Sequence, residues 1–462
     1  MPERRPYTCA LLTIATIALS CVHIVRAQDT LSLTQFLGRV AQTNPVLRSA
    51  ALESEVADAE ILQARGAFDL FLKSKYERKG ITDKIKVDNL DAGLEMPLAT
   101  ALGPRLSTSY RRGDGTSINP ENVTASDGEL GLGVSVPLWQ GLQTDSRRTS
   151  LRKAEARPEL AQIFGDQERL ALLRQASVRY WDWVETNDVL RTMRDIVTLA
   201  EDRLRFLQSR ARAGEIATID TVEAQQELER RRGEYFRAER NAEQTSIAAR
   251  AMLWQSELAS LPQAACRVVF PVEATPGESR RETDRLNALA KRPELRRLSV
   301  QQRVVGLDVT LAQELQRPLI EAQGQLLRSL GATGDNTFKL GLNISHPLFQ
   351  RTATAQEEIA QVSLQRIGLQ QRLIERQVRA EIDDALSAIA KAEERIRTAE
   401  REVRWSEILQ QAEVRKFVAG ESTLLVVNIR ERALADARIR LTNARADYWR
   451  ATAVYQWATA QL

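Results

Sequence analysis

Residues 130–140 read LGLGVSVPLWQ, and residues 340–350 read LGLNISHPLFQ. Seven of the eleven positions are identical. Each copy is an alternating apolar run that is closed by proline and followed by a helical pattern of roughly seventy residues. Each copy therefore predicts a strand that leads into a long helix. We interpret the chain as a tandem duplication, and we read its function from a two-repeat architecture.

The composition fits one elongated unit built from two repeats of about 220 residues. Among 462 residues, 65 basic side chains nearly balance 61 acidic ones, and the two signs are interspersed along the helical segments. A nucleic-acid interface needs clustered basic residues, so this pattern indicates solvated helix faces and argues against nucleic acid as a partner.

The first 27 residues have the layout of a secretory signal peptide. Arg4 and Arg5 precede an apolar core over 10–25, and cleavage is expected after Ala27. In the alternative interpretation Cys21 becomes a lipidated N-terminus, although Ala18-Leu19-Ser20 lacks leucine at the usual place. The mature protein leaves the cytoplasm in both cases. No later run of about twenty apolar residues predicts a spanning helix, so strands would have to hold the protein in a membrane.

The first repeat is assigned to residues 28–261. A helical pattern interrupted at Asn44-Pro45 ends near Gly66. A strand block is predicted over 66–138, a long helix over 141–212 in which Pro158 causes a bend or marks the first turn, and a return helix over 218–256. The expected strands cover roughly 68–76, 86–97, 104–112 and 129–138, with a turn at Gly80.

A proline-containing linker over 262–282 separates this repeat from the second, residues 283–462. The second repeat is predicted to contain a helix to about Gln316, strands over 318–349, a long helix over 352–418 and a return helix over 422–462. The first repeat has one extra hairpin, at about 86–112. Two shorter helices placed end to end match one long helix of about 105 Å, which predicts a coiled-coil-like rod with strands at one end only.

Strands of nine to eleven residues joined by polar loops are long enough to cross a bilayer in a closed barrel. One chain supplies four to six strands, whereas at least about eight are needed to leave no unpaired edge in lipid. Several chains must therefore contribute. A lipid-facing row is expected at Leu130, Leu132, Val134 and Val136. The fold class is thus mainly α with a β-barrel portion shared between chains.

The ordered motifs resemble the TolC-like outer membrane efflux protein family over nearly the whole chain from about Leu31. The motifs are Asn44-Pro45-Val46-Leu47, Pro137-Leu138-Trp139-Gln140-Gly141, Gly214 with Asp220, Arg292-Pro293-Glu294-Leu295, Pro347-Leu348-Phe349, Phe417-Val418-Ala419-Gly420 and Asn443-Ala444-Arg445-Ala446-Asp447-Tyr448.

The resemblance implies a homotrimer with a shared barrel of twelve strands and a helical tunnel that narrows at its far end. It also implies contact with outer-membrane lipid, and docking to a periplasmic adaptor and an inner-membrane pump. By position, the docking tips would lie at Gly214, Glu215, Asp220, Gly420, Glu421 and Ser422.

This chain departs from the family pattern in two places. The extra hairpin does not fit four strands per chain, so either the barrel is larger or the hairpin packs elsewhere. Several relatives carry charged residues after the second tip, where this chain has Ser422, Leu424, Leu425, Val426, Val427 and Asn428. A charged closing lock is therefore in doubt here.

Several residues allow two interpretations. Trp139 and Phe349, each two residues after Pro137 or Pro347, could form an aromatic girdle or simply pack at a strand–helix junction. Asp220 could bond at the tip or stabilise a helix N-terminus, which we favour. Trp181, Trp183 and Trp405 are expected to pack between helices.

The sequence offers no catalytic, metal or cofactor constellation. His346 is the only histidine after the signal peptide, and Cys266 is the only cysteine certain to remain. Neither a histidine metal site nor a Cys/His nucleophile can form within one chain. We expect a passive exit duct for efflux or type I secretion, located in the outer membrane and extending into the periplasm. The alternative is a secreted coiled-coil scaffold.

Overall fold

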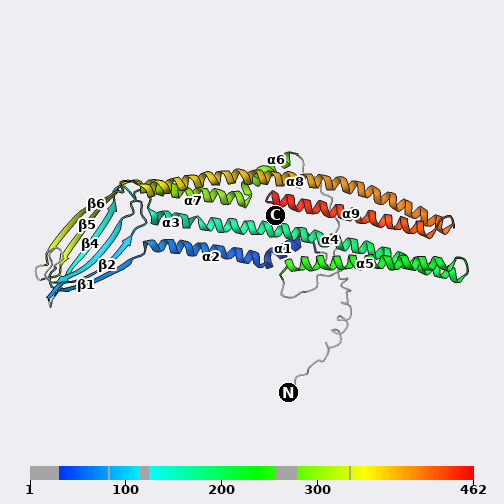
Figure 1. Ribbon diagram of the computed structural model, residues 1–462, viewed down its shortest axis with the longest axis horizontal. Coiled ribbons are helices and arrows are strands. Elements are labelled where there is room, and N and C mark those ends of the chain that lie inside the picture. Colours follow the sequence, from blue (N-terminus) through cyan, green and yellow to red (C-terminus); the bar gives the residue numbers. More distant parts are fainter. Residues whose placement is uncertain (1–30, 82–83, 115–123, 255–277, 332–333) are drawn as a thin grey trace, which may run out of the picture. The chain divides into compact units, whose positions relative to one another are not determined.

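The computed structural model describes residues 31–81, 84–114, 124–254, 278–331 and 334–462. The predicted signal peptide and most of the predicted linker lie outside these residues. The described helices are α1 (Leu33–Thr43), α2 (Pro45–Arg65), the short 3-10 helix η1 (Gly66–Phe68), α3 (Ser146–Glu155), α4 (Arg157–Arg212), α5 (Thr218–Met252), α6 (Glu278–Lys291), α7 (Pro293–Leu315), α8 (Arg351–Val418) and α9 (Leu424–Ala458) (Figure 1).

Asn44 explains the predicted interruption of the first helical segment. Its side chain accepts a hydrogen bond from the Val46 N–H at 3.0 Å, and Pro45 occupies the first position of α2. Proline suits this position because it has no N–H to leave unpaired there. The second long helix, α8, is unbroken over 68 residues, within one residue of its predicted start.

The helix predicted over 141–212 begins later and is divided in two. Asp145 caps α3 by accepting from the Arg148 N–H at 2.9 Å, so the helix starts at Ser146. Ala156 separates α3 from α4. Pro158 lies in the first turn of α4, which is one of the two positions predicted for this proline. A proline cannot donate to the preceding turn, which favours a break just before it.

The strands form one antiparallel meander in the order β1-β2-β3-β4-β5-β6. Their bounds are β1 (Phe71–Ile81), β2 (Lys84–Pro97), β3 (Arg105–Asp114), β4 (Glu129–Pro137), β5 (Leu319–Ser329) and β6 (Asn336–Ser345). The expected turn at Gly80 is wrong: this residue lies inside β1, at a register shift next to Lys79. A glycine in a strand pattern can mark a bulge as well as a turn.

The extra hairpin belongs to this sheet. β2 pairs with β1 and β3, and β3 pairs with β4. The idea that the hairpin packs elsewhere is therefore wrong. The first strand begins at Phe71 rather than near residue 68, because residues 66–68 still form a 3-10 turn.

The chain separates into two compact units, and each contains parts of both repeats. Unit 1 takes in the described parts of Met1–Thr43, Ala176–Ala274 and Ala392–Arg450. Unit 2 takes in Asn44–Gln175, the described part of Thr275–Lys391, and Ala451–Leu462. The sheet lies wholly in unit 2, whereas both predicted tips lie in unit 1.

Aromatic side chains form the core of unit 1 at one level. The Trp181 and Trp449 rings stack with centroids 5.0 Å apart, and the Tyr180 hydroxyl donates to the Leu31 carbonyl at 2.8 Å. Trp183 is also buried, as predicted. The same expectation is wrong for Trp405, which is 65% exposed.

In unit 2, α2, α3, α7 and the first half of α8 lie side by side beyond the sheet (Figure 1). Arg296 on α7 pairs with Asp166 on α4 at 2.7 Å. Arg292 is buried just before α7, stacks on the Trp457 ring at 4.3 Å and pairs with Glu381 on α8 at 2.9 Å. The arginine of the Arg-Pro-Glu-Leu motif thus joins three helical segments. Among the described helices, none has the length and apolar character needed to cross a membrane.

Candidate functional site

The two predicted tip glycines end their helices in the same way. Gly214 has φ +75° and Gly420 has φ +80°. In each case the following glutamate N–H reaches back five residues, from Glu215 to the Arg210 carbonyl at 3.0 Å and from Glu421 to the Lys416 carbonyl at 2.9 Å. This pattern caps helix C-termini, and glycine adopts the left-handed conformation without a Cβ penalty.

The other predicted tip residues have modest local roles. Asp220 lies in the first turn of α5, whose N-cap residue, Ala217, makes no side-chain cap bond. An acidic residue at this place favours the helix N-terminus electrostatically. Glu215 pairs with Arg210 at 2.8 Å, and the Ser422 hydroxyl donates to Glu413. Each of these contacts is therefore local to one of the two turns.

A small apolar core joins the helices behind the two turns. Leu424 on α9 packs with residues of α4 and α5, so the two tips are not independent hairpins. Val427, one turn further along α9, is fully buried. The buried members of the cluster are Ala200, Leu204, Leu207, Ala224, Leu228 and Leu424.

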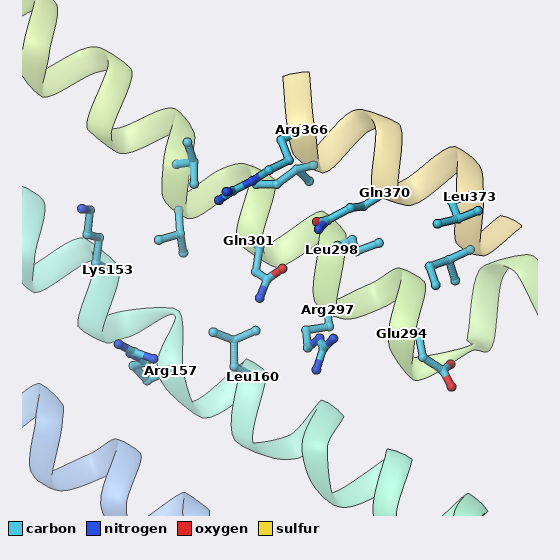
Figure 2. A pocket seen from close by; sticks show the side chains of 14 residues that line it. Lys153, Arg157, Leu160, Glu294, Arg297, Leu298, Gln301, Arg366, Gln370 and Leu373 are labelled. Atoms are coloured by element: carbon cyan, nitrogen blue, oxygen red, sulfur yellow. The ribbon is translucent and has the colours of Figure 1, made fainter. Parts of the chain in front are cut away.

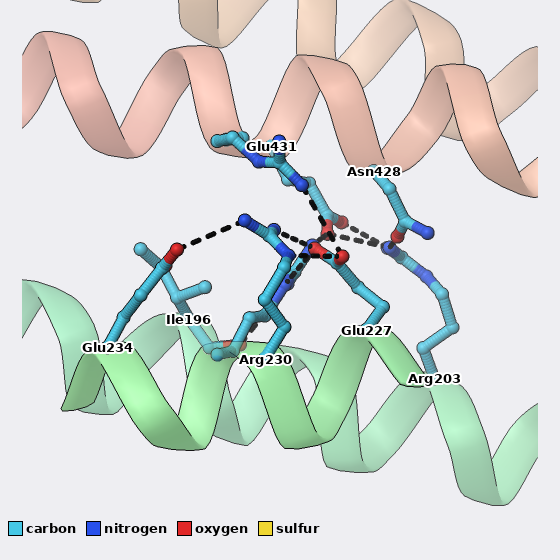
Figure 3. A network of polar contacts seen from close by, with 9 residues as sticks. Ile196, Arg203, Glu227, Arg230, Glu234, Asn428 and Glu431 are labelled. Atoms are coloured by element: carbon cyan, nitrogen blue, oxygen red, sulfur yellow. Dashed lines mark hydrogen bonds and ion pairs between the residues drawn. The ribbon is translucent and has the colours of Figure 1, made fainter. Parts of the chain in front are cut away.

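A buried ionic cluster follows directly behind this core (Figure 3). The Glu431 carboxylate on α9 accepts two hydrogen bonds from the Arg203 guanidinium on α4, one of them at 2.6 Å. It also accepts a hydrogen bond from Arg231 on α5 at 3.0 Å. Arg231 also donates to Glu227 at 2.9 Å, and Arg203 reaches the Asn428 side chain at 3.3 Å. One carboxylate thus ties three helices together.

The second acid of the cluster has a shifted pKa. Burial alone would raise the pKa of the Glu227 carboxyl, but hydrogen bonds from Arg230 and Arg231 outweigh it and hold the pKa below its ordinary value of 4.5. The hydrogen bond between Arg230 and Glu227 also raises the pKa of the Arg230 guanidinium. Both groups are therefore charged near neutral pH.

Our sequence analysis missed this cluster, although a signal was present. Leu424, Val427 and Glu431 follow at helical spacing on α9, so Glu431 falls on an otherwise apolar seam. Arg231 interrupts the seam of α5 in the same way after Leu228. Lone charges of opposite sign at core positions of different helices predict a buried pair.

The strand–helix junction is fixed by buried polar side chains next to Pro137. The Glu314 carboxylate accepts from the N–H groups of Gly141 at 3.0 Å and Gln143 at 3.3 Å. Arg148 donates to the Ala101 carbonyl at 2.5 Å and to the Gly141 carbonyl. These contacts turn the chain from β4 towards α3, which requires Gly141 at φ +93°.

The two aromatic residues of the repeated motif are not buried at this junction. Trp139 is 49% exposed and Phe349, after Pro347, is 78% exposed. The Arg351 guanidinium lies 5.2 Å from the Phe349 ring centroid. Contacts within one chain therefore do not bury these two rings.

One face of the sheet is apolar and uncovered by the described residues. Directly paired positions across all six strands form the row Leu72, Leu94, Thr108, Leu132, Leu326 and Phe338. Every member is exposed, and Leu132 in the central strand is 59% exposed. The predicted row Leu130, Leu132, Val134 and Val136 shares this face; its first three members are exposed, and Val136 is half-buried. A soluble sheet would bury such a face.

The opposite face carries ion pairs and hydrogen bonds. Arg105 donates to Glu321 and, at 3.2 Å, to the Ser135 hydroxyl. Arg111 pairs with Asp91 at 3.0 Å, and Gln325 donates to the Ser109 hydroxyl at 2.9 Å. Further pairs include Lys73 with Glu95 and Arg111 with Glu129. The sheet is therefore amphipathic from edge to edge.

A groove of about 810 Å³ lies in unit 2 between α3, α4, α7 and α8. Figure 2 shows Arg297 and Arg366 at the groove beside the apolar side chains of Leu160 and Leu298. No histidine, cysteine or serine lines it, so it offers no thiol or serine hydroxyl nucleophile and no imidazole base. Over the part of the chain that the structure describes, no group of three or more His, Cys, Asp or Glu side chains could hold a metal ion.

Comparison with known proteins gives a sequence match for part of the chain and a fold match for nearly all of it. Residues 98–253 match the family model described as outer membrane efflux protein. The solved outer-membrane channel OprN has a TM-score of 0.68 at 16% identity, covering 95% of this chain and 92% of OprN. No curated protein matches the sequence.

Two further solved structures agree with this result. The CmeC outer membrane channel of Campylobacter jejuni has a TM-score of 0.67 at 14% identity, with 94% of this chain and 86% of CmeC covered. The outer membrane protein VceC of Vibrio cholerae has a TM-score of 0.66 at 16% identity, with 94% and 97% covered. The predicted fold class and the resemblance to TolC-like outer membrane efflux proteins are confirmed.

Proposed function

We propose that this chain, which has the sequence match and the fold of the outer membrane efflux protein family, is the outer-membrane exit duct of an efflux or type I secretion system. The observation that carries the proposal is the exposed apolar face of the six-stranded sheet. In lipid this face meets hydrocarbon, and the opposite face with Arg105, Glu321 and Arg111 lines a water-filled lumen.

The duct is passive, and the energy for transport comes from a partner. The six-stranded sheet is open, because β1 and β6 do not pair, and membrane barrels need at least about eight strands, so the proposed duct is an oligomer. We propose a homotrimer because of the likeness to the family. A periplasmic adaptor and an inner-membrane pump are the partners proposed for the helical portion. No enzymatic activity is proposed.

The tips are proposed as the docking region for these partners. Gly214 and Gly420 set two turns of the same shape, and Glu215 and Glu421 are exposed next to them. Asp220 and Ser422 complete the two turns. Replacing both glutamates with arginine should abolish transport while the oligomer remains in the membrane. The change Glu243→Arg on the exposed side of α5 is the matched control, and equal transport by both variants would contradict tip docking.

The exposed rings at the end of β4 and after β6 are proposed to lie at the inner interface of the outer membrane. Trp139 and Phe349 follow prolines where the apolar strands end, and aromatic rings favour the headgroup region of a bilayer. The proposed location is therefore the outer membrane, with the helices in the periplasm. Removal of the first 27 residues remains part of this proposal.

The proposal is tested by isolating the mature protein from outer-membrane fractions in mild detergent and measuring its native mass. A trimer that resists alkaline washing is the expected result. A monomer or dimer released by the wash would overturn the duct and would favour the secreted coiled-coil scaffold.

A further inference from the structure

The sheet of one chain ends in two open edges. Among the described strands, β1 and β6 each hydrogen-bond on one side only. They have similar lengths, 11 and 10 residues, and every residue of β6 is exposed. Unpaired backbone groups are not tolerated in hydrocarbon, so both edges need a partner strand if the sheet lies in a membrane.

The β6 edge of one copy can pair with the β1 edge of another copy. Because the sheet is an antiparallel meander with an even number of strands, β1 and β6 run in opposite directions. Placing β6 of one copy beside β1 of the next continues the same alternation. The apolar face also continues, because Leu72 on β1 and Phe338 to Ile344 at alternate positions of β6 belong to one face.

The helices that flank the sheet fit the same arrangement. α2 leads into β1 through η1, and β6 leads into α8, so edge pairing brings α2 of one copy towards α8 of another. Each helix carries an exposed stripe at spacings of three and four residues, as in a coiled-coil seam. The stripe of α2 is Leu52, Glu55, Ala59 and Leu62, and that of α8 is Ile359, Val362, Arg366, Leu369 and Leu373. Each stripe contains one charge, and the two charges are opposite.

We infer that three copies close edge to edge into a barrel of eighteen strands, in place of the twelve that the family resemblance implies. The inference rests on the proposed function and on the finding that β2 and β3 lie inside the sheet. Barrel diameter grows roughly in proportion to strand number, so this lumen is about half again as wide as that of a twelve-stranded barrel. Size selection of the cargo then falls on the helical portion or on the pump.

Disulfide cross-linking in outer membranes tests the inference. In a Cys266→Ser background, Leu72→Cys is combined in turn with Ile344→Cys, Leu342→Cys or Leu340→Cys. One combination should give a covalent trimer on a denaturing, non-reducing gel. Within one chain these positions lie on opposite edges with four strands between them, roughly 24 Å apart, so an intrachain disulfide cannot form.

The matched control replaces Leu72→Cys by Lys73→Cys, which lies on the polar face and should not cross-link with the same three partners. A charge exchange gives a second measurement. Glu55→Arg or Arg366→Glu alone should reduce the recovered trimer, and the two together should restore it.

The outcomes separate the inference from the proposed function. A wash-resistant trimer without any edge cross-link in the whole set would overturn the eighteen-stranded barrel and leave the duct intact. A native dimer with edge cross-links would also overturn it, because two copies close at twelve strands. A soluble monomer would overturn both.

Discussion

The Glu431 carboxylate on α9 lies 3.0 Å from the Arg231 guanidinium on α5, and each side chain is only 2% exposed. Removing one member of a buried, hydrogen-bonded pair leaves an uncompensated charge. We therefore expect Glu431→Leu to destabilise the tip region of unit 1 by about 3 kcal/mol. Amide hydrogen exchange of α9 near Asn428 would report the loss.

Two controls accompany this prediction. Arg205→Ala removes an exposed ion pair with Asp202 and should cost less than about 1 kcal/mol. The double variant Glu431→Leu with Arg231→Met should recover part of the loss, because it removes both buried charges. Equal effects of Glu431→Leu and Arg205→Ala would show that the cluster does not hold the three helices together.

The pH dependence of the same region depends on Glu227. Its pKa lies below 4.5 in the folded protein, so the stability that it contributes is fully present above that value and is lost as the pH falls through the lower, folded pKa. Glu227→Gln should flatten the dependence of the thermal midpoint on pH below 4.5. Glu243→Gln, on the exposed surface of α5, should keep the wild-type slope. Identical slopes for Glu227→Gln and the wild type would contradict this role.

Much of the architecture could be predicted because the periodic spacing of apolar residues indicates the helices and strands, and glycine and proline mark where they begin and end. The helix predicted over 352–418 is observed over Arg351–Val418, since its apolar seam and its terminal Gly420 are both visible in the sequence. The repeated strand identified the sheet. The alternation of Leu130, Leu132, Val134 and Val136 correctly indicated one apolar face, on which Val136 alone of the four is half-buried.

The features that could not be predicted from the sequence have a common physical cause. Local sequence did not show that Gly80 sits at a register shift inside β1, or that Asp145 caps a separate helix before Ala156. The register shift and the helix cap both depend on which hydrogen bonds form in the folded chain. The burial of Glu431 depends on arginines more than 190 residues away, and the 65% exposure of Trp405 depends on which helix faces pack together in the folded chain.

The two turn glycines should be sensitive to substitution for a conformational reason alone. A Cβ at Gly214 or Gly420 would meet no atom within 4 Å, but both residues have positive φ. We expect Gly214→Ala or Gly420→Ala to cost about 1 kcal/mol each, and asparagine to cost less. Gly233→Ala is the matched control, because this helical glycine in α5 also has open space around it.

Gly233→Ala should stabilise the protein by about 0.5–1 kcal/mol, since alanine favours the helix. Thermal unfolding of the three variants side by side would give the comparison. A Gly214→Ala variant as stable as Gly233→Ala would mean that the turn tolerates a Cβ and that its shape is not fixed by the left-handed residue.

The two faces of the sheet should respond oppositely to a new charge. Leu132→Lys places an ammonium group in the centre of the apolar row, where hydrocarbon would surround it, and a cost of about 2–4 kcal/mol per chain is expected near the bilayer midplane. The predicted result is loss of wash-resistant oligomer from outer membranes. Gln323→Lys is the control, because this exposed residue pairs with Ser135 on the polar face and its charge would meet water and Glu321. If Leu132→Lys assembled as well as Gln323→Lys, the apolar row could not be facing lipid, and the assignment of lipid to one face and lumen to the other would have to be abandoned.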